Sequence, residues 1–229
     1  MLLLSIDTST AACSVALHKD DALAGCYELF TERTSAAMLT TLIHDVLHQA
    51  GHELNELDAI AVAKGPGSYT GLRISVSTAK GLCFALDKPL IAINTLAAMA
   101  EQIRACFPAG YKLCPMIDAR RMEVYCALYD TTGHEIQPTS AQIIDDTSFQ
   151  DWLAQGPVVF FGDGAGKCKP LIDKHANAIF PEMNVIPSAR TIGKLATAAF
   201  LDGQFENMVS FEPFYLKDFM TTQPRKAVL

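Results

Sequence analysis

The stretch of this 229-residue chain whose residue types best suit chemistry is residues 65–73, with the sequence Gly-Pro-Gly-Ser-Tyr-Thr-Gly-Leu-Arg. It follows an apolar run over residues 57–63 that predicts a buried strand, and Ser68 is placed to cap a helix that begins behind it. Gly71 and Gly81 fall inside that helix, where a glycine costs about 1 kcal/mol relative to alanine. Both glycines therefore predict a close approach by a ligand, by the chain's own core or by another protein.

His44 and His48 stand one helical turn apart and form the one pattern in the sequence with metal-ligand spacing. They come late in a predicted helix over residues 35–50, on the face opposite Leu42 and Val46. This placement favours solvated surface histidines, so we expect no metal site. The seven cysteines are scattered and form no C-x-x-C pair, which indicates reduced thiols rather than a zinc site.

Asp7, Ser68 and the glycine turn over residues 162–167 are the other candidates for a reactive site. No glycine follows Asp7 in Thr-Ser-Thr-Ala-Ala, which favours a hydroxyl-rich turn over a phosphate loop. Gly-Asp-Gly-Ala-Gly-Lys at 162–167 fits neither the dinucleotide nor the Walker A spacing, although a residual nucleotide site there stays open. The surroundings of Ser68 do not match the Gly-x-Ser-x-Gly elbow, and Lys64 opposes a nuclease-type metal site. We expect no catalytic or cofactor-binding residue, and structural roles for Asp7, Ser68 and Asp118.

An internal repeat shows which elements must position these residues. Ile-Asp ends one predicted strand and Ala-Leu ends the returning strand, with the same spacing from Asp7 to Leu17 and from Asp118 to Leu128. Each hairpin is followed by helical and apolar segments and a glycine turn. The pattern predicts an α/β chain of two tandem ribonuclease-H-like lobes, the actin and sugar-kinase (ASKHA) fold. We place the boundary at Phe-Pro-Ala-Gly, with an N-terminal lobe over 1–108 and a C-terminal lobe with its tail over 109–229.

Composition limits the partners of the chain. It has 25 acidic and 18 basic residues, a net charge of −7, and its short basic pair near the end is Arg225-Lys226. Such a chain is poorly suited to hold tRNA alone. Only 19% of residues are charged and 50% are hydrophobic, which favours a protein interface, with a monomer of generous core as the alternative. No signal peptide or membrane-spanning run is present, which predicts a cytoplasmic protein.

Four motifs together resemble the TsaB (YeaZ) family, a non-catalytic ASKHA-fold subunit of the bacterial machinery that makes threonylcarbamoyladenosine on tRNA. They are Ile-Asp-Thr-Ser-Thr at 6–10 with 13–17, the 65–73 run, Ile-Asp-Ala-Arg at 117–120 with 123–125, and Pro-Phe-Tyr-Leu at 213–216. The resemblance spans nearly the whole chain, and the 65–73 run is its specific part.

The resemblance implies that the chain binds a TsaD-type paralogue, which transfers the threonylcarbamoyl group to the adenosine next to the tRNA anticodon, with a TsaE-type ATPase and ATP completing the set. Because the chain is acidic and has no basic stripe, we expect tRNA contact only through the complex, with the tail around Lys217, Arg225 and Lys226 contributing. The alternative is an ASKHA-type ATPase or phosphotransferase that uses Asp7 and the turn at 162–166.

The predicted partner surface lies on the helix over 35–50 and the helix that Ser68 opens, because both carry more small and apolar residues than one core needs. The same surface predicts a two-fold homodimer when the paralogue is absent. Periodicity leaves open which stripe of the second helix faces outward. The predicted partner-binding residues are Met38, Leu39, Leu42, Gly71, Leu72, Ser75, Thr78, Ala79 and Leu82.

Overall fold

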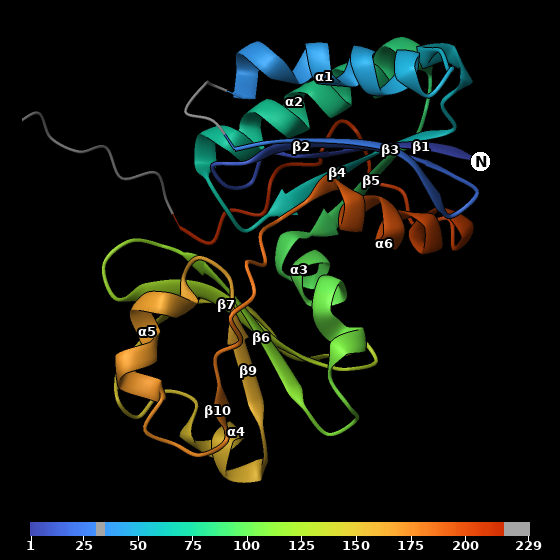
Figure 1. The fold of residues 1–229 in the computed structure, drawn as a ribbon. Coiled ribbons are helices and arrows are strands. Elements are labelled where there is room, and N and C mark those ends of the chain that lie inside the picture. The colour runs from blue at the N-terminus through green and yellow to red at the C-terminus, as the bar shows by residue number, and fades with distance from the viewer. Residues whose placement is uncertain (31–34, 218–229) are drawn as a thin grey trace, which may run out of the picture.

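The structure is a computed structural model that describes residues 1–30 and 35–217. Two five-stranded sheets lie one above the other, with helices outside and between them (Figure 1). The first half comprises β1 (Leu2–Asp7), β2 (Cys13–Lys19), β3 (Ala22–Leu29), α1 (Ser35–Gln49), β4 (Ala59–Gly65), α2 (Tyr69–Leu86), β5 (Leu90–Asn94) and α3 (Thr95–Ile103). The second half comprises β6 (Lys112–Asp118), β7 (Glu123–Asp130), β8 (Glu135–Ile143), α4 (Gln150–Gln155), β9 (Val158–Phe161), α5 (Ala165–Ile172), β10 (Ala178–Ile179) and α6 (Ala189–Leu201).

The two sheets share one topology, which confirms the repeat predicted from the sequence. The first has the order β3-β2-β1-β4-β5 and the second the order β10-β9-β6-β7-β8. In each sheet the opening hairpin is antiparallel, and the central strand pairs in parallel with the strand that follows the first helix. Asp7 and Asp118 therefore end equivalent central strands, β1 and β6. The mixed α/β class follows from this arrangement.

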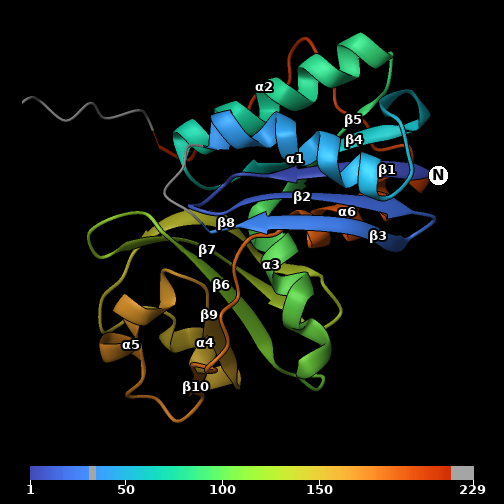
Figure 2. The same cartoon turned by 45° about the horizontal axis from the view of Figure 1, so that its top comes forward.

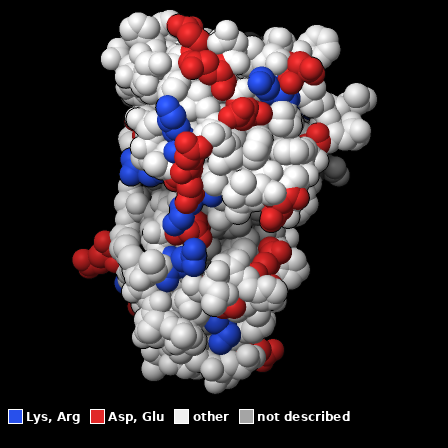
Figure 3. Space-filling model, turned by 90° about the vertical axis from the view of Figure 1, so that its right-hand side faces the viewer, with Lys and Arg blue, Asp and Glu red and all other residues white. Residues whose placement is uncertain are grey.

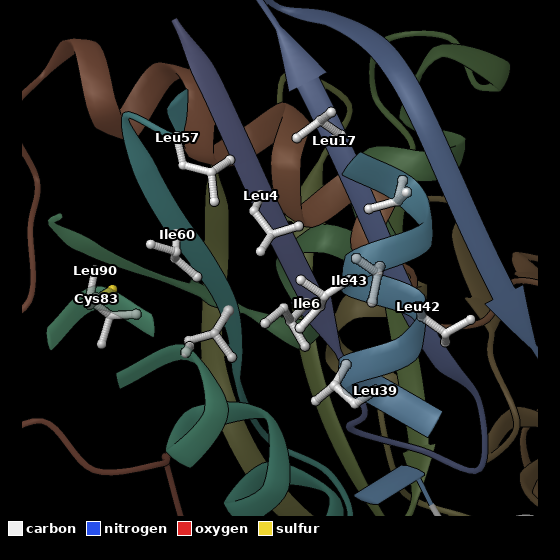
Figure 4. Close-up of a cluster of buried hydrophobic side chains, with 14 of the residues drawn as sticks. Leu4, Ile6, Leu17, Leu39, Leu42, Ile43, Leu57, Ile60, Cys83 and Leu90 are labelled. Atoms are coloured by element: carbon white, nitrogen blue, oxygen red, sulfur yellow. The ribbon is translucent and has the colours of Figure 1, made fainter. Parts of the chain in front are cut away.

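The core of the first half lies on both faces of β1, all of whose residues are buried. Leu4 and Ile6 point to the side covered by α1 and α2, where they meet Leu39 and Ile43 (Figure 4). Leu3 points to the opposite side and packs in the cluster that α6 covers. Full burial of such a side chain contributes about 1.5–3 kcal/mol, so this two-sided packing fixes the position of Asp7 at the strand end.

The last helix of each half covers the sheet of the other half. Leu96 and Met99 of α3 pack in the core of the second sheet, whereas Ile192 and Ala196 of α6 pack on the first sheet. Both helices lie between the sheets in Figures 1 and 2. Gly193 lets α6 approach closely, because a Cβ there would lie 2.2 Å from Nδ1 of His18. The helix α6 therefore contacts the first sheet, although it follows the second sheet in the chain. The division of the chain at residue 108 stays a prediction.

Other expected elements are found with small shifts. The helix predicted over 35–50 is α1, and α4 is one of the helical segments predicted after the second hairpin. The edge strands β3 and β8 were not predicted, because most of their residues are partly or fully exposed and form no apolar run. Within residues 1–30 and 35–217, no helix is long and apolar enough to cross a membrane.

Candidate functional site

The turn after β1 packs directly onto the start of α2, and this contact accounts for two glycines. A Cβ atom on Gly67 would lie 2.3 Å from the carbonyl oxygen of Ser9, and one on Gly71 would lie 1.9 Å from that of Thr8. The Ser68 amide donates a 2.6 Å hydrogen bond to the Ser9 oxygen, and the Thr8 hydroxyl donates a 2.6 Å bond to the Gly71 oxygen. The close approach predicted at Gly71 is made by the chain's own backbone.

Ser68 caps α2, as its position in the sequence indicates. Its hydroxyl oxygen accepts a 3.3 Å hydrogen bond from the amide of Gly71. A serine used in this way satisfies one of the free amides at a helix N-terminus. The contact supports the structural role predicted for Ser68.

Asp7 is buried at the end of β1, with 2% of its surface exposed. Its Oδ1 accepts a 2.8 Å hydrogen bond from the Ser9 amide, and its Oδ2 has no hydrogen-bond partner among the described residues. Burial raises the pKa of Asp7 from 3.8 to about 6, although hydrogen bonds from Ser9 act in the opposite direction. Keeping the buried Asp7 carboxylate ionised near neutral pH therefore lowers the stability of the folded state.

The glycine turn before α5 packs against β6 in the same way. A Cβ atom on Gly162 would lie 2.3 Å from the carbonyl oxygen of Met116, and one on Gly164 would lie 3.1 Å from the amide nitrogen of Asp118. That amide donates a 3.0 Å hydrogen bond to Oδ1 of Asp163. The glycines of the second candidate nucleotide turn are therefore required by its close packing on β6.

Lys167, which ends the glycine run, closes the turn between β6 and β7. Its ammonium group donates hydrogen bonds of 2.5 Å to Oδ1 of Asp118, 2.7 Å to the Arg121 oxygen and 2.7 Å to the Glu123 oxygen. Burial raises the pKa of Asp118, but the hydrogen bonds from Lys167 and from the Arg120 amide outweigh it and hold that pKa below its usual range. These contacts support a structural role for Asp118 and leave Lys167 no free donor for a phosphate.

The turn that Lys167 closes carries two adjacent arginines in left-handed backbone conformations. Arg120 has φ +68° and Arg121 has φ +49°. Residues other than glycine, asparagine and aspartate rarely adopt this region, and the strain costs roughly 1–3 kcal/mol at each position. Sequence reasoning quoted Arg120 in a motif and gave it no role, because a sequence does not show backbone strain.

His44 and His48 lie on the exposed side of α1, with ring centroids 5.8 Å apart and nearly parallel. Nδ1 of His44 lies 3.1 Å from the carboxylate of Asp45. No group of three or more metal-ligating side chains is arranged to hold an ion in the part of the chain that the structure describes. The expectation of no metal site stays a prediction.

Six of the nine predicted partner-binding residues are buried within the folded chain, and Met38, Thr78 and Leu82 are partly exposed. Buried side chains belong to the core of the isolated chain, so contact of these positions with a partner stays a prediction. The six are Leu39, Leu42, Gly71, Leu72, Ser75 and Ala79. That a partner binds this pair of helices stays a prediction.

The outward stripe of α2 consists of Arg73, Ser77, Gly81 and Phe84. Phe84 is 83% exposed, and a Cβ atom on Gly81 would meet nothing within 4 Å. The close approach that Gly71 makes inside the chain is therefore absent at Gly81. Sequence reasoning missed this stripe because one phenylalanine among small and polar residues does not form an apolar pattern.

The segment after α6 ties the two halves together, and Figure 1 shows it in red, ending between them. The Phe214 amide donates a 2.7 Å hydrogen bond to the oxygen of Lys64 in β4. Lys217 then bonds to the Glu123 carboxylate and to the Ala119 oxygen in the β6–β7 turn. The predicted tail residues Arg225 and Lys226 lie outside the described residues.

Charge on the face in Figure 3 is mixed, with acidic and basic side chains interspersed along one stripe and no continuous basic area. This agrees with the net charge of −7. On this side of the molecule, nothing resembles the basic surface that holds a nucleic acid by its phosphates.

Comparisons with known proteins extend these observations. The family model described as TsaD, tRNA N6-adenosine threonylcarbamoyltransferase, matches residues 25–216. The chain is 30% identical over 223 residues to the tRNA threonylcarbamoyladenosine biosynthesis protein TsaB of Escherichia coli (strain K12), with 95% of each chain covered.

Solved structures agree with the sequence comparison. YeaZ from Pseudomonas aeruginosa superposes with a TM-score of 0.81 at 30% identity, covering 94% of this chain and 99% of that one. The activator of the 2-hydroxyisocaproyl-CoA dehydratase from Clostridium difficile, with bound ADPNP, has a TM-score of 0.51 at 10% identity and covers 89% of this chain and 97% of that one, a likeness of fold alone. The predicted two-lobed ASKHA class is confirmed. Similarity in sequence and in fold over nearly the whole length shows that this chain belongs to the TsaB (YeaZ) family.

Proposed function

We propose that this chain is a non-catalytic subunit that binds a TsaD-type paralogue and supports threonylcarbamoyl transfer to the adenosine next to the tRNA anticodon, with a TsaE-type ATPase. The observation that carries this proposal is the use of both candidate nucleotide turns for internal packing: the turn after Asp7 packs against Gly67 and Gly71, and Lys167 uses its three donors on the β6–β7 turn. The reaction is the one named for the relatives. Because that reaction acts on tRNA, we place the chain in the cytoplasm.

The partner surface we propose is the outer side of α1 and α2, which lie together on the first sheet away from the second (Figure 2). Gly81 lets a helix of the partner approach closely, and Phe84 offers a large apolar contact beside it. An exposed aromatic next to small residues is typical of a protein contact. In the absence of the paralogue, the same side pairs with a second copy of the chain in a two-fold dimer.

A second candidate function is an ATPase or phosphotransferase, and the unpartnered Oδ2 of Asp7 is the observation that favours it. An ATP-dependent enzyme needs a carboxylate that reaches a metal ion and a loop that reaches phosphates. Asp7 is buried, and the turn that follows it is packed against Gly67 and Gly71. We therefore rank this function second.

Two measurements on the purified chain test the proposal. We expect no ATP turnover with magnesium above that of a blank, and saturable binding to the purified TsaD-type protein by calorimetry. Turnover that disappears in Asp7→Ala while the variant remains folded would establish the second function instead. Failure of the wild-type chain to bind the paralogue would reject the scaffold role.

A further inference from the structure

The turn between β6 and β7 presents two unpaired arginines on one exposed tip. The side chains of Arg120 and Arg121 are exposed, and neither guanidinium has a hydrogen-bond or ion-pair partner among the described residues. The chain has a net charge of −7, so two unpaired guanidinium groups at adjacent positions form a local positive charge on an acidic protein. Arginine is the side chain best suited to bidentate contact with phosphate or carboxylate oxygens.

The backbone of this turn is held from several sides, so the two arginines project from a fixed base. The Ala119 amide donates a 3.1 Å hydrogen bond to the Glu123 oxygen, and the Arg120 amide donates a 2.7 Å bond to Oδ1 of Asp118. The ammonium group of Lys167 donates a hydrogen bond to the Arg121 oxygen. A rigid base lowers the entropy cost of ordering the turn on binding. Both arginines adopt a left-handed backbone conformation, which is strained for arginine and would not be strained for glycine.

The carboxylates of the same turn are already neutralised. Lys217 pairs with Glu123, and Lys167 pairs with Asp118 at 2.5 Å. Asp163 accepts the Asp118 amide, and burial raises the pKa of Asp163. The charge left free toward solvent is therefore that of the two arginines.

Aromatic side chains lie beside the turn and extend toward α2. The ammonium group of Lys217 lies 5.7 Å from the centroid of the Tyr125 ring. The ring centroids of Tyr215 and Tyr69 lie 4.8 Å apart. Arg73, on the outward stripe of α2, donates a 3.3 Å hydrogen bond to the Tyr215 hydroxyl. Arginines interleaved with partly exposed tyrosines are the composition that binds unpaired RNA, with phosphates on the cations and bases on the rings.

We infer that the Arg120–Arg121 turn, together with the adjoining Tyr125 and Tyr215, is the RNA-contacting surface of this chain within the assembled complex. The guanidinium groups bind backbone phosphates of the tRNA, and the tyrosine rings support unstacked bases. This inference rests on the proposed function, because the isolated acidic chain holds RNA too weakly for the contact to form alone. It favours RNA over a partner's carboxylates because the reaction named for the relatives acts on tRNA, whose backbone phosphates suit bidentate contact with arginine.

The test removes the guanidinium groups without disturbing the turn. Glycine adopts positive φ without strain, so the double variant Arg120→Gly, Arg121→Gly keeps the backbone. In complex with the TsaD-type protein, an unmodified tRNA transcript is titrated at several salt concentrations. We expect the affinity to fall about tenfold or more, and the slope of log K against log salt to fall in magnitude by about 1–2, since each lost phosphate contact removes about 0.7–0.9.

Two matched variants sharpen the result. Lys19→Ala with Lys174→Ala removes the same two charges from exposed positions elsewhere and is expected to leave the affinity and the slope unchanged. Arg120→Lys with Arg121→Lys keeps the charges but loses bidentate contact, so it is expected to retain most of the slope at reduced affinity. Unchanged tRNA binding by the glycine variant would overturn the inference.

Binding to the paralogue is measured in parallel, so that the two proposals fail separately. The glycine variant is expected to bind the TsaD-type protein as the wild type does. A loss of that binding would show that the turn contacts the partner protein and would reject the RNA assignment. If the wild-type chain itself does not bind the paralogue, the proposed function fails, whatever the arginines do.

Discussion

Gly71 and Gly81 lie in the same helix and have opposite surroundings. A Cβ atom on Gly71 would lie 1.9 Å from a backbone oxygen, whereas one on Gly81 would meet nothing within 4 Å. Gly71→Ala is therefore expected to lower the free energy of unfolding by about 3 kcal/mol or more, because the backbone of the Thr8 turn must move. Gly81→Ala is expected to raise it by about 1 kcal/mol, since alanine is the better helix former.

Urea denaturation of the two variants at neutral pH measures both effects. The pair controls for helix propensity, because each variant makes the same substitution in α2. Equal changes in the two variants would contradict the tight packing of the β1–β2 turn on the helix start.

Asp7 carries the clearest pH dependence in the molecule. Its pKa of about 6 lies above the unfolded value of 3.8, so the folded state binds the proton more tightly. Its stabilising contribution is fully present below pH 3.8 and is lost as the pH rises through about 6. Asp7→Asn cannot ionise, so its unfolding free energy relative to the wild type is expected to rise by about 3 kcal/mol over this window.

Asp118 at the equivalent strand end gives the control of opposite sign. Its pKa is lowered in the fold, so its contribution is present above the usual aspartate value and is lost as the pH falls. Asp118→Asn is expected to be less stable than the wild type at neutral pH and to approach it in acid. Chemical denaturation at a series of pH values checks both variants, and parallel curves for the wild type and Asp7→Asn would refute the buried ionisation.

At the scale of elements, apolar periodicity found α1 and α2 but not the direction in which their stripes face. The stripe with Leu72 and Ala79 covers the sheet, and in the adjacent stripe Gly71 meets the β1–β2 turn and Ser75 is buried, whereas Thr78 and Leu82 stay partly exposed. Core and partner surfaces are both apolar, and a sequence pattern does not separate them. The outward position of Phe84 follows only from the packing of the other stripes.

The partner surface on α2 is tested at Gly81, where a long side chain fits the isolated chain but blocks a second helix. Gly81→Arg is expected to remain folded, because its Cβ meets nothing within 4 Å. It is expected to abolish self-association and to weaken binding to the TsaD-type paralogue at least tenfold, since a partner helix would meet a buried charge. Analytical ultracentrifugation and calorimetry measure the two effects.

Gly81→Ala is the matched control and is expected to keep both interactions. Ser75→Arg does not test the surface, because Ser75 is fully buried and its substitution unfolds the chain. If Gly81→Arg stays dimeric and binds the paralogue like the wild type, the interface lies elsewhere.

At the scale of the whole molecule, the repeat of hairpin, helix, strand and glycine turn could be recognised in the sequence because both hairpins keep Ile-Asp and Ala-Leu at one spacing. The sequence did not show that α3 and α6 each cover the sheet of the other half. The apolar pattern of a helix shows that the helix has an apolar side, but it does not show which sheet that side covers. Small residues on the first sheet, Ala61 and Ala63, leave the room that α6 fills. The sequence likewise did not show that the segment after α6 crosses to the β6–β7 turn.

The most direct test of the whole account is the rate of threonylcarbamoyl transfer to tRNA by the TsaD-type and TsaE-type proteins, measured with and without this chain. We expect that transfer requires the chain, that Asp7→Asn supports it like the wild type, and that Gly81→Arg does not. Transfer that proceeds at the full rate without the chain would contradict the scaffold role. A loss of transfer in Asp7→Asn, with binding to the paralogue intact, would show instead that this chain supplies a catalytic carboxylate.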